Sequence, residues 1–163
     1  MLIEHFQTLA QYNTLANGRL YKVCSQLSDV ERKQTRPAFF KSIHGTLNHI
    51  MLGDCIWMGR FTGQQMPSQG LDAILYDNFE DLCAARVLED ERIEVFIRNL
   101  DADFLQGKII YKNNQGKIHN DSVSLLLAHF FNHQTHHRGQ IHDMLTQTEI
   151  TPPVLDMHRV IAP

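Results

Sequence analysis

The stretch of sequence that decides the fold is SVSLLLAHFFNHQTHHRGQIHDMLTQ, residues 122–147. Its apolar residues recur at the three- and four-residue spacing of one helix face, and its first half is strongly apolar. A serine opens the stretch, and Thr151-Pro152-Pro153 closes it. This arrangement predicts one long helix.

Three earlier segments have the same helical periodicity. The first covers residues 3–27, where apolar side chains form one stripe. The second begins near Ser42 or Thr46 and continues to Phe61, and the third covers residues 78–100. The sequence therefore predicts four long helices in all.

The connections between these helices are long. Residues 63–70 contain glycine and proline and break the helical pattern. Between the third and fourth helices, residues 108–112 and 117–119 follow a period of two and flank an Asn/Gly turn, which predicts a short β-hairpin. We therefore expect an all-α fold: a four-helix bundle with long inter-helix connections and this hairpin, in a single domain over residues 1–163.

The composition argues against several classes of protein. The chain of 163 residues has 15 Lys and Arg against 18 Asp and Glu and no basic cluster, so we expect no nucleic-acid partner. It contains no run of about 20 apolar residues that could span a membrane, and no secretory signal at its start. The three cysteines form neither a disulfide framework nor a CxxC motif. Together these features predict a cytoplasmic location.

Histidines are the first indication of chemistry, because six of the ten fall within residues 119–142. Residues four apart on a helix lie about 6 Å apart along its axis, so two such imidazoles can share one metal ion. Either His129 and His133 or His133 and His137 satisfy this spacing, whereas His136 points away from the second pair. His133 is thus the common member of both candidate pairs.

A metal site in a bundle needs a third ligand, which a facing helix would supply. His44 and His49 are the available donors on the second helix, and His49 is preferred because it lies beside the apolar stripe. Burying several imidazoles without a shared partner would cost about 1–3 kcal/mol each, which favours a metal site over hydrogen-bonded core histidines. Three neutral imidazoles suit zinc, nickel, copper or iron and leave a coordination position open.

Motifs along nearly the whole chain resemble those of one known family. They are Tyr12-Asn13, Ala16-Asn17, Arg19-Leu20, Ser42-Ile43-His44-Gly45-Thr46-Leu47-Asn48-His49, Asp54, Trp57, Asn132-His133, His136-His137-Arg138-Gly139-Gln140 and Pro152-Pro153-x-Leu155-Asp156. Together they resemble the DinB family of damage-inducible proteins. The most specific of them is His-x-x-x-His-Arg-Gly-Gln after a histidine in the second helix. Leu15 departs from the tryptophan that is frequent at its position in the family, which concerns packing only.

The resemblance implies a four-helix bundle, commonly a homodimer, with three histidines around one divalent transition metal ion. Carried over by position, these ligands are His49, His133 and His137. Zinc or nickel is the first expectation, and iron, manganese or copper would also fit. Whether His44 or His129 takes part is left open.

The resemblance also implies a range of activities. Relatives include thiol-dependent transferases and a maleylpyruvate isomerase, which use a low-molecular-weight thiol. We therefore expect a metal-dependent enzyme with a small-molecule substrate, either a thiol S-transferase or a hydrolase. Asn48, Arg138 and Gln140 are candidates for orienting the ligands or an anionic substrate, and no catalytic residue is assigned. The alternative is a non-enzymatic, stress-induced protein that binds metal or acts as a dimeric interaction protein.

Overall fold

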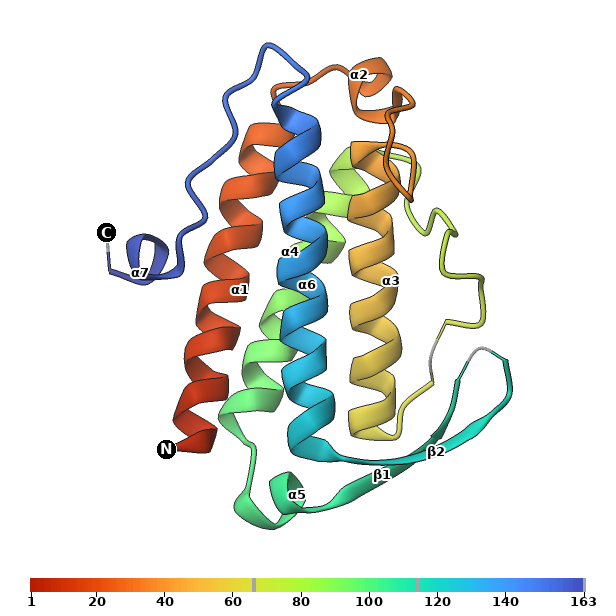
Figure 1. The fold of residues 1–163 in the computed structure, drawn as a ribbon, viewed down its shortest axis with the longest axis vertical. Helices are drawn as coiled ribbons and strands as arrows, with labels where there is room; N and C mark the ends of the chain where they lie inside the picture. Colours follow the sequence, from red (N-terminus) through yellow and green to blue (C-terminus); the bar gives the residue numbers. More distant parts are fainter. Residues whose placement is uncertain (66, 114, 163) are drawn as a thin grey trace.

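In the part of the chain that the structure describes, four long helices form the body of the molecule (Figure 1). The computed structural model describes residues 1–65, 67–113 and 115–162. The long helices are α1 (Leu2–Cys24), α3 (Ile43–Thr62), α4 (Phe79–Arg98) and α6 (Val123–Leu145). The predicted bundle is confirmed, although the first helix ends at Cys24, three residues before the predicted boundary.

Within the described residues, three shorter helices lie in the connections and near the C-terminal end: α2 (Asp29–Lys33), α5 (Ala102–Gln106) and α7 (Met157–Ile161). Each has five residues, too few for the apolar periodicity that identifies a helix in sequence. In the described part of the chain, none of the helices is long and apolar enough to cross a membrane.

The bundle is not a simple up-and-down arrangement. In Figure 1, α3 and α4 both run from the top of the view to the bottom, whereas α1 and α6 run from the bottom to the top. The connection after α3 leads the chain back along the whole bundle before α4 begins, which makes this topology possible. Both α1 and α3 pack against α4 and against α6, so that α1 and α3 lie diagonally opposite each other.

Polar side chains fix where the long helices begin. The Ser42 hydroxyl accepts a hydrogen bond from the Gly45 N–H at 2.9 Å and starts α3, which agrees with one of the two predicted starts. Asn78 caps α4, and Ser122 caps α6. Gly63 ends α3 with a left-handed φ of 67°, a conformation that glycine adopts without a steric penalty.

The predicted hairpin is present and antiparallel. Strands β1 (Lys108–Lys112) and β2 (Ile118–Ser122) pair so that Lys108 lies opposite Ser122 and Lys112 lies opposite Ile118. The second strand continues three residues beyond the predicted boundary and leads directly into α6. The hairpin lies beside the C-terminal end of α3 (Figure 1).

Among the described residues, two large apolar clusters fill the bundle, one toward each end, and a third, smaller cluster packs α7 against α1. The first includes Phe6 and Phe130, and the second includes Leu20 and Leu82. Between them, at the middle of the long helices, lies a layer of buried polar side chains: Asn13, Asn17, Asp54, Arg86, Asp90, Gln134 and Arg138. The candidate functional histidines lie at the level of this layer, between α3 and α6.

Candidate metal centre

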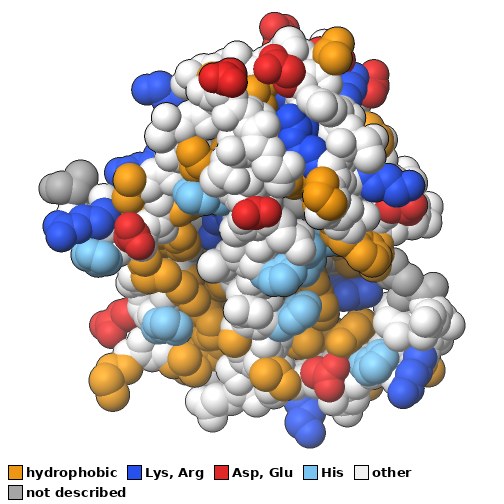
Figure 2. Space-filling model, turned by 45° about the horizontal axis from the view of Figure 1, so that its top comes forward, with side chains coloured by type: hydrophobic (Ala, Val, Ile, Leu, Met, Phe, Trp, Pro, Cys, Tyr) orange, Lys and Arg blue, Asp and Glu red, His pale blue; other side chains and the backbone are white. Residues whose placement is uncertain are grey.

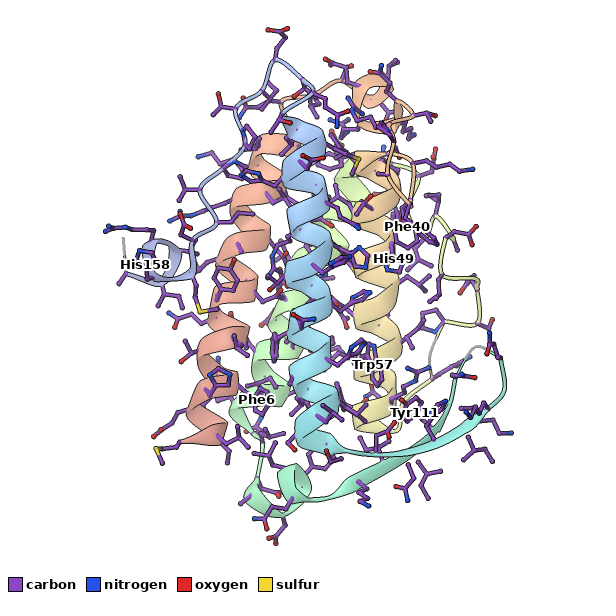
Figure 3. The ribbon with its side chains drawn as sticks, viewed as in Figure 1. Phe6, Phe40, His49, Trp57, Tyr111 and His158 are labelled. Carbon is purple, nitrogen blue, oxygen red and sulfur yellow. The ribbon has the colours of Figure 1, made fainter. Side chains whose placement is uncertain are left out.

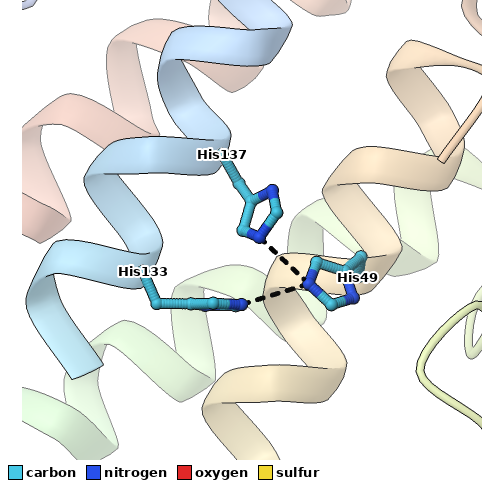
Figure 4. A group of neighbouring side chains, drawn as sticks. All are labelled: His49, His133 and His137. Atoms are coloured by element: carbon cyan, nitrogen blue, oxygen red, sulfur yellow. Dashed lines mark hydrogen bonds between the residues drawn. The ribbon is translucent and has the colours of Figure 1, made fainter. Parts of the chain in front are cut away.

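Three histidines from two facing helices meet in the middle of the bundle (Figure 4). His49 comes from α3, and His133 and His137 come from successive turns of α6. The Nε2 atom of His49 lies 3.1 Å from that of His133 and 3.2 Å from that of His137. One ligand atom from each of the three lies within 4.8 Å of the others.

These separations fit the coordination of one divalent ion. Imidazole nitrogens bind zinc at about 2.0–2.1 Å in a tetrahedral arrangement, which places two ligand nitrogens about 3.3 Å apart. The two measured separations are close to this value. The donor set has no carboxylate, and neutral imidazoles suit zinc, nickel, copper or iron.

Hydrogen bonds on the far side of two rings decide which nitrogen faces inward. The Nδ1 of His49 lies 2.8 Å from the Leu71 carbonyl oxygen, and the Nδ1 of His137 lies 2.7 Å from Oε1 of Gln140. Both partners are acceptors, so each Nδ1 donates its proton and each Nε2 of a neutral ring keeps its lone pair. The Nε2 lone pairs of His49 and His137, 3.2 Å apart, repel each other unless both bind the same cation. In metal sites, hydrogen bonds to the other ring nitrogen orient the ligating histidines in the same manner.

Burial keeps these imidazoles neutral. Desolvation and the neighbouring histidines lower the pKa of His133 to about 3, and desolvation lowers the pKa of His137 to about 4. The pKa of His49 is also lowered by burial. Metal ions bind the neutral form of histidine, so the three rings have the protonation state that a metal requires at neutral pH.

Two neighbours that the sequence analysis did not identify shape the centre. Gly53 faces the His133 ring so closely that a Cβ at this position would lie 2.9 Å from Cε1 of His133. Phe40 stacks on the His49 ring, with 3.7 Å between the ring centres, and covers one side of the centre (Figure 3). A glycine inside an otherwise apolar helix was the one signal in sequence that could have indicated a close approach there.

The structure separates the remaining histidines of the motif from the three. The Nε2 of His44 lies 2.9 Å from the carbonyl oxygen of Tyr76, so this side chain is held elsewhere. His129 and His136 are exposed and are not part of the group. Of the candidate ligands, His49, His133 and His137 are the three whose ligand atoms lie together, and that they bind a metal ion stays a prediction.

Gln140 alone among the three proposed orienting residues touches the centre, through His137. Asn48 is buried and bonds the backbone of Tyr76 through both its amide oxygen and its amide nitrogen. Arg138 is 2% exposed and donates to Asn13 and Asn17 on α1. Arg138 therefore faces the core of the bundle and is not placed to bind an anionic substrate at the histidines.

The buried polar layer explains several motifs that the sequence analysis could quote without assigning a role. Asp54 accepts hydrogen bonds from Arg86 of α4 at 2.6 Å and from Gln134 of α6 at 2.9 Å. Arg86 also lies 2.9 Å from Asp90, which accepts a hydrogen bond from Asn17 of α1 at 2.9 Å. The network joins all four long helices behind the histidines. It joins residues from four separate segments of the sequence, so the periodicity of any one segment could not reveal it.

A cavity of about 540 Å³ opens beside the centre. His49 and His133 line one part of it, and Trp57, Arg60 and Tyr111 line another. Figure 2 shows histidine side chains gathered on one face of the molecule with hydrophobic side chains around them, while the lysines and arginines of that face are scattered. A small molecule in this cavity could reach two of the three imidazoles.

The fold and the centre define a class: a four-helix bundle with three histidines from two helices that lie close enough together to hold one metal ion. The chain belongs to the DinB family, whose model matches residues 1–163. It is 31% identical over 148 residues to Protein DinB of Bacillus subtilis (strain 168), which covers 85% of this chain and 83% of that protein. The fold is also similar to the crystal structure of a DinB-like protein from Bacillus cereus ATCC 10987. That likeness has a TM-score of 0.66 at 19% identity and covers 93% of this chain and 95% of the other.

Proposed function

We propose that this chain is a metal-dependent enzyme that holds one divalent transition metal ion with His49, His133 and His137. The observation that carries the proposal is the convergence of their Nε2 atoms, with separations of 3.1 and 3.2 Å. Zinc or nickel is the expected metal, and iron, manganese or copper also suit the donors. When bound, such an ion acts as a Lewis acid and lowers the pKa of a water molecule or a thiol.

The surroundings of the three histidines support an enzyme over a purely structural metal site. Structural zinc sites have four protein ligands, whereas catalytic sites keep a position open for a substrate. The two further candidates are not in the group, since His44 bonds the Tyr76 carbonyl and His129 is exposed. A cavity lined by His49 and His133 gives a small molecule access to the same place.

The reaction we propose is the transfer of a low-molecular-weight thiol or a hydrolysis, both of which need an activated nucleophile. The residues of the chain would orient and shield that reaction. Gln140 and the Leu71 carbonyl fix two imidazole rings, and Phe40 keeps water away from one side of His49. The homodimer and the damage-inducible expression that the family resemblance implies remain predictions, as does the cytoplasmic location expected from the composition.

Elemental analysis of untagged protein tests the metal site. We expect about one divalent metal ion per chain in the parent and almost none in the double variant His133→Ala, His137→Ala. The matched control is His5→Ala, His158→Ala, which removes two exposed histidines outside the group and should keep the metal. A parent protein that holds no metal and takes up neither zinc nor nickel would contradict the proposal.

Activity is then measured on the metal-loaded parent. We expect the parent to transfer a thiol to an electrophile or to hydrolyse an ester or amide. This activity should be absent from the double variant. In the parent, it should be lost when the metal is removed and recovered when the metal is restored. Full occupancy without either activity, together with a fourth protein ligand seen by X-ray absorption, would instead favour a non-enzymatic metal-binding protein.

A further inference from the structure

The cavity beside the histidines has a second polar end, formed by Arg60. Its lining runs from His49 and His133, past Ile56 and Leu71, to Arg60 and the hairpin. Arg60 is the one residue with a permanent charge among the described residues that line it. A volume of about 540 Å³ is in the range of small-molecule sites, which is about 300–1,000 Å³.

The Arg60 guanidinium lies close to two aromatic rings, Trp57 and Tyr111. Its central carbon lies 4.5 Å from the centre of the Trp57 ring and 4.6 Å from that of Tyr111. Nη2 donates a hydrogen bond to the backbone oxygen of Lys112 at 3.2 Å, which ties the group to strand β1. Figure 3 shows Trp57 and Tyr111 together beside the hairpin. A guanidinium held in this way presents its remaining donors in a fixed plane.

No carboxylate of the described residues lies within 4.0 Å of this guanidinium. Its Nε is buried and makes no hydrogen bond to any of the residues described. Arg86, the buried arginine of α4, differs sharply because it has Asp54 and Asp90 as partners. Partial burial of a cation without a counter-ion is unfavourable, and it lowers the pKa of Arg60. The Arg60 guanidinium therefore presents an uncompensated positive charge to the cavity, which an anionic group of a ligand would match.

We propose that this cavity binds a small organic monocarboxylate, with the carboxylate on Arg60 and the rest of the molecule extending toward His133. A single arginine supplies one positive charge, and its planar donors match the two oxygens of a carboxylate. The inference deepens the proposed function, because it names the class of substrate that would reach the histidines. The carboxylate site itself needs no metal, so it can be tested independently.

The distance along α3 between the two ends of the cavity sets the length of the ligand. Gly53, which contacts the His133 ring, and Arg60 are seven residues apart on α3, or about 10 Å along the helix axis. Ile56 and Leu71 line the cavity between its two ends and offer apolar surface. The ligand would therefore carry its carboxylate on an apolar body several atoms long.

Trp57 is the only tryptophan of the chain, so its fluorescence reports binding beside Arg60 directly. The probes are hexanoate and 1-hexanol, which have the same apolar chain and differ in charge. We expect the parent to bind hexanoate about tenfold more tightly, the value of one charge-assisted hydrogen bond. In Arg60→Gln the two probes should bind within twofold of each other, and Arg60→Lys should keep part of the preference. Arg19→Gln, which removes a charge from α1 away from the cavity, should behave like the parent.

Equal binding of hexanoate and hexanol to the parent would overturn the inference, whatever the variants do. Tighter binding of hexyl phosphate than of hexanoate would overturn the carboxylate class. With zinc added, 6-mercaptohexanoate should bind more tightly than 6-mercapto-1-hexanol, and Arg60→Gln should remove the difference. Metal content is measured on the same samples. If the protein holds about one metal ion per chain but shows no preference for hexanoate, this inference alone is contradicted. If the protein prefers hexanoate but holds no metal, the inference is supported and only the proposed function is contradicted.

Discussion

At the scale of single residues, the geometry of the candidate centre depends on Gly53, because glycine has no Cβ. Gly53 lies in the middle of α3, where glycine lowers helix stability by about 0.5–1 kcal/mol relative to alanine. Its position is explained by the His133 ring, because a Cβ would lie 2.9 Å from Cε1 and 3.5 Å from Nδ1 of that ring. The space left by Gly53 is the space that the imidazole occupies.

We therefore expect Gly53→Ala to push the His133 ring away from the other two. Displacing a ligand in this way should weaken zinc binding by at least about tenfold, as changes around metal ligands do. Isothermal titration calorimetry with zinc measures this effect. The control is Gly18→Ala in α1, where a Cβ would meet nothing within 4 Å and where the replacement should stabilise the helix without changing the affinity. Unchanged affinity in Gly53→Ala would mean that His133 is not a ligand in this position.

At the scale of elements, the buried polar network connects the four long helices to one another. Asp54 has no exposed surface and bonds both α4, through Arg86, and α6, through Gln134. Burial raises the pKa of this carboxyl group, while the nearby Arg86 opposes that change. Gln134 follows His133 directly in sequence, so the same turn of α6 carries both a network residue and a candidate ligand.

Asp54→Ala should lower the free energy of unfolding by about 3–5 kcal/mol, because it leaves the buried guanidinium of Arg86 with a single carboxylate partner. Urea unfolding followed by circular dichroism measures the change. Asp77→Ala is the comparison, since it breaks a 3.1 Å ion pair with Lys33 in which the carboxylate side chain is 86% exposed. Exposed pairs contribute less than about 1 kcal/mol. Equal losses in the two variants would contradict the stabilising role of the network.

The elements also show which parts of the structure the sequence could reveal. Apolar periodicity and the capping residues Ser42 and Ser122 were enough to predict the long helices, because both signals are local. The alternation before α6 was likewise enough for the hairpin. The parallel course of α3 and α4 was not predictable, since it depends on how a long connection crosses the bundle.

The candidate centre also has features that the sequence could predict and features that it could not. Spacing on one helix could propose His133 with either His129 or His137, and a facing helix could supply His49. The roles of Phe40, Gly53 and Arg60 depend on His137, His133 and Tyr111, which are far away in the chain and come into contact with them only after folding. Local patterns thus lead to the candidate ligands, whereas the residues around them and the cavity become visible only in the tertiary structure.

For the whole molecule, a metal ion at the three histidines would tie α3 to α6. Unfolding separates these ligands, so a metal that binds only the folded chain stabilises it by an amount that grows with the metal concentration. We expect zinc at 100 times its dissociation constant to raise the free energy of unfolding by about 2.7 kcal/mol over the value in excess chelator. Urea unfolding with zinc and with chelator gives the difference. His133→Ala, His137→Ala should show none, and His5→Ala, His158→Ala should show the full effect. If the double variant were stabilised as much as the parent, zinc would bind elsewhere on the folded protein and the three histidines would not form its site.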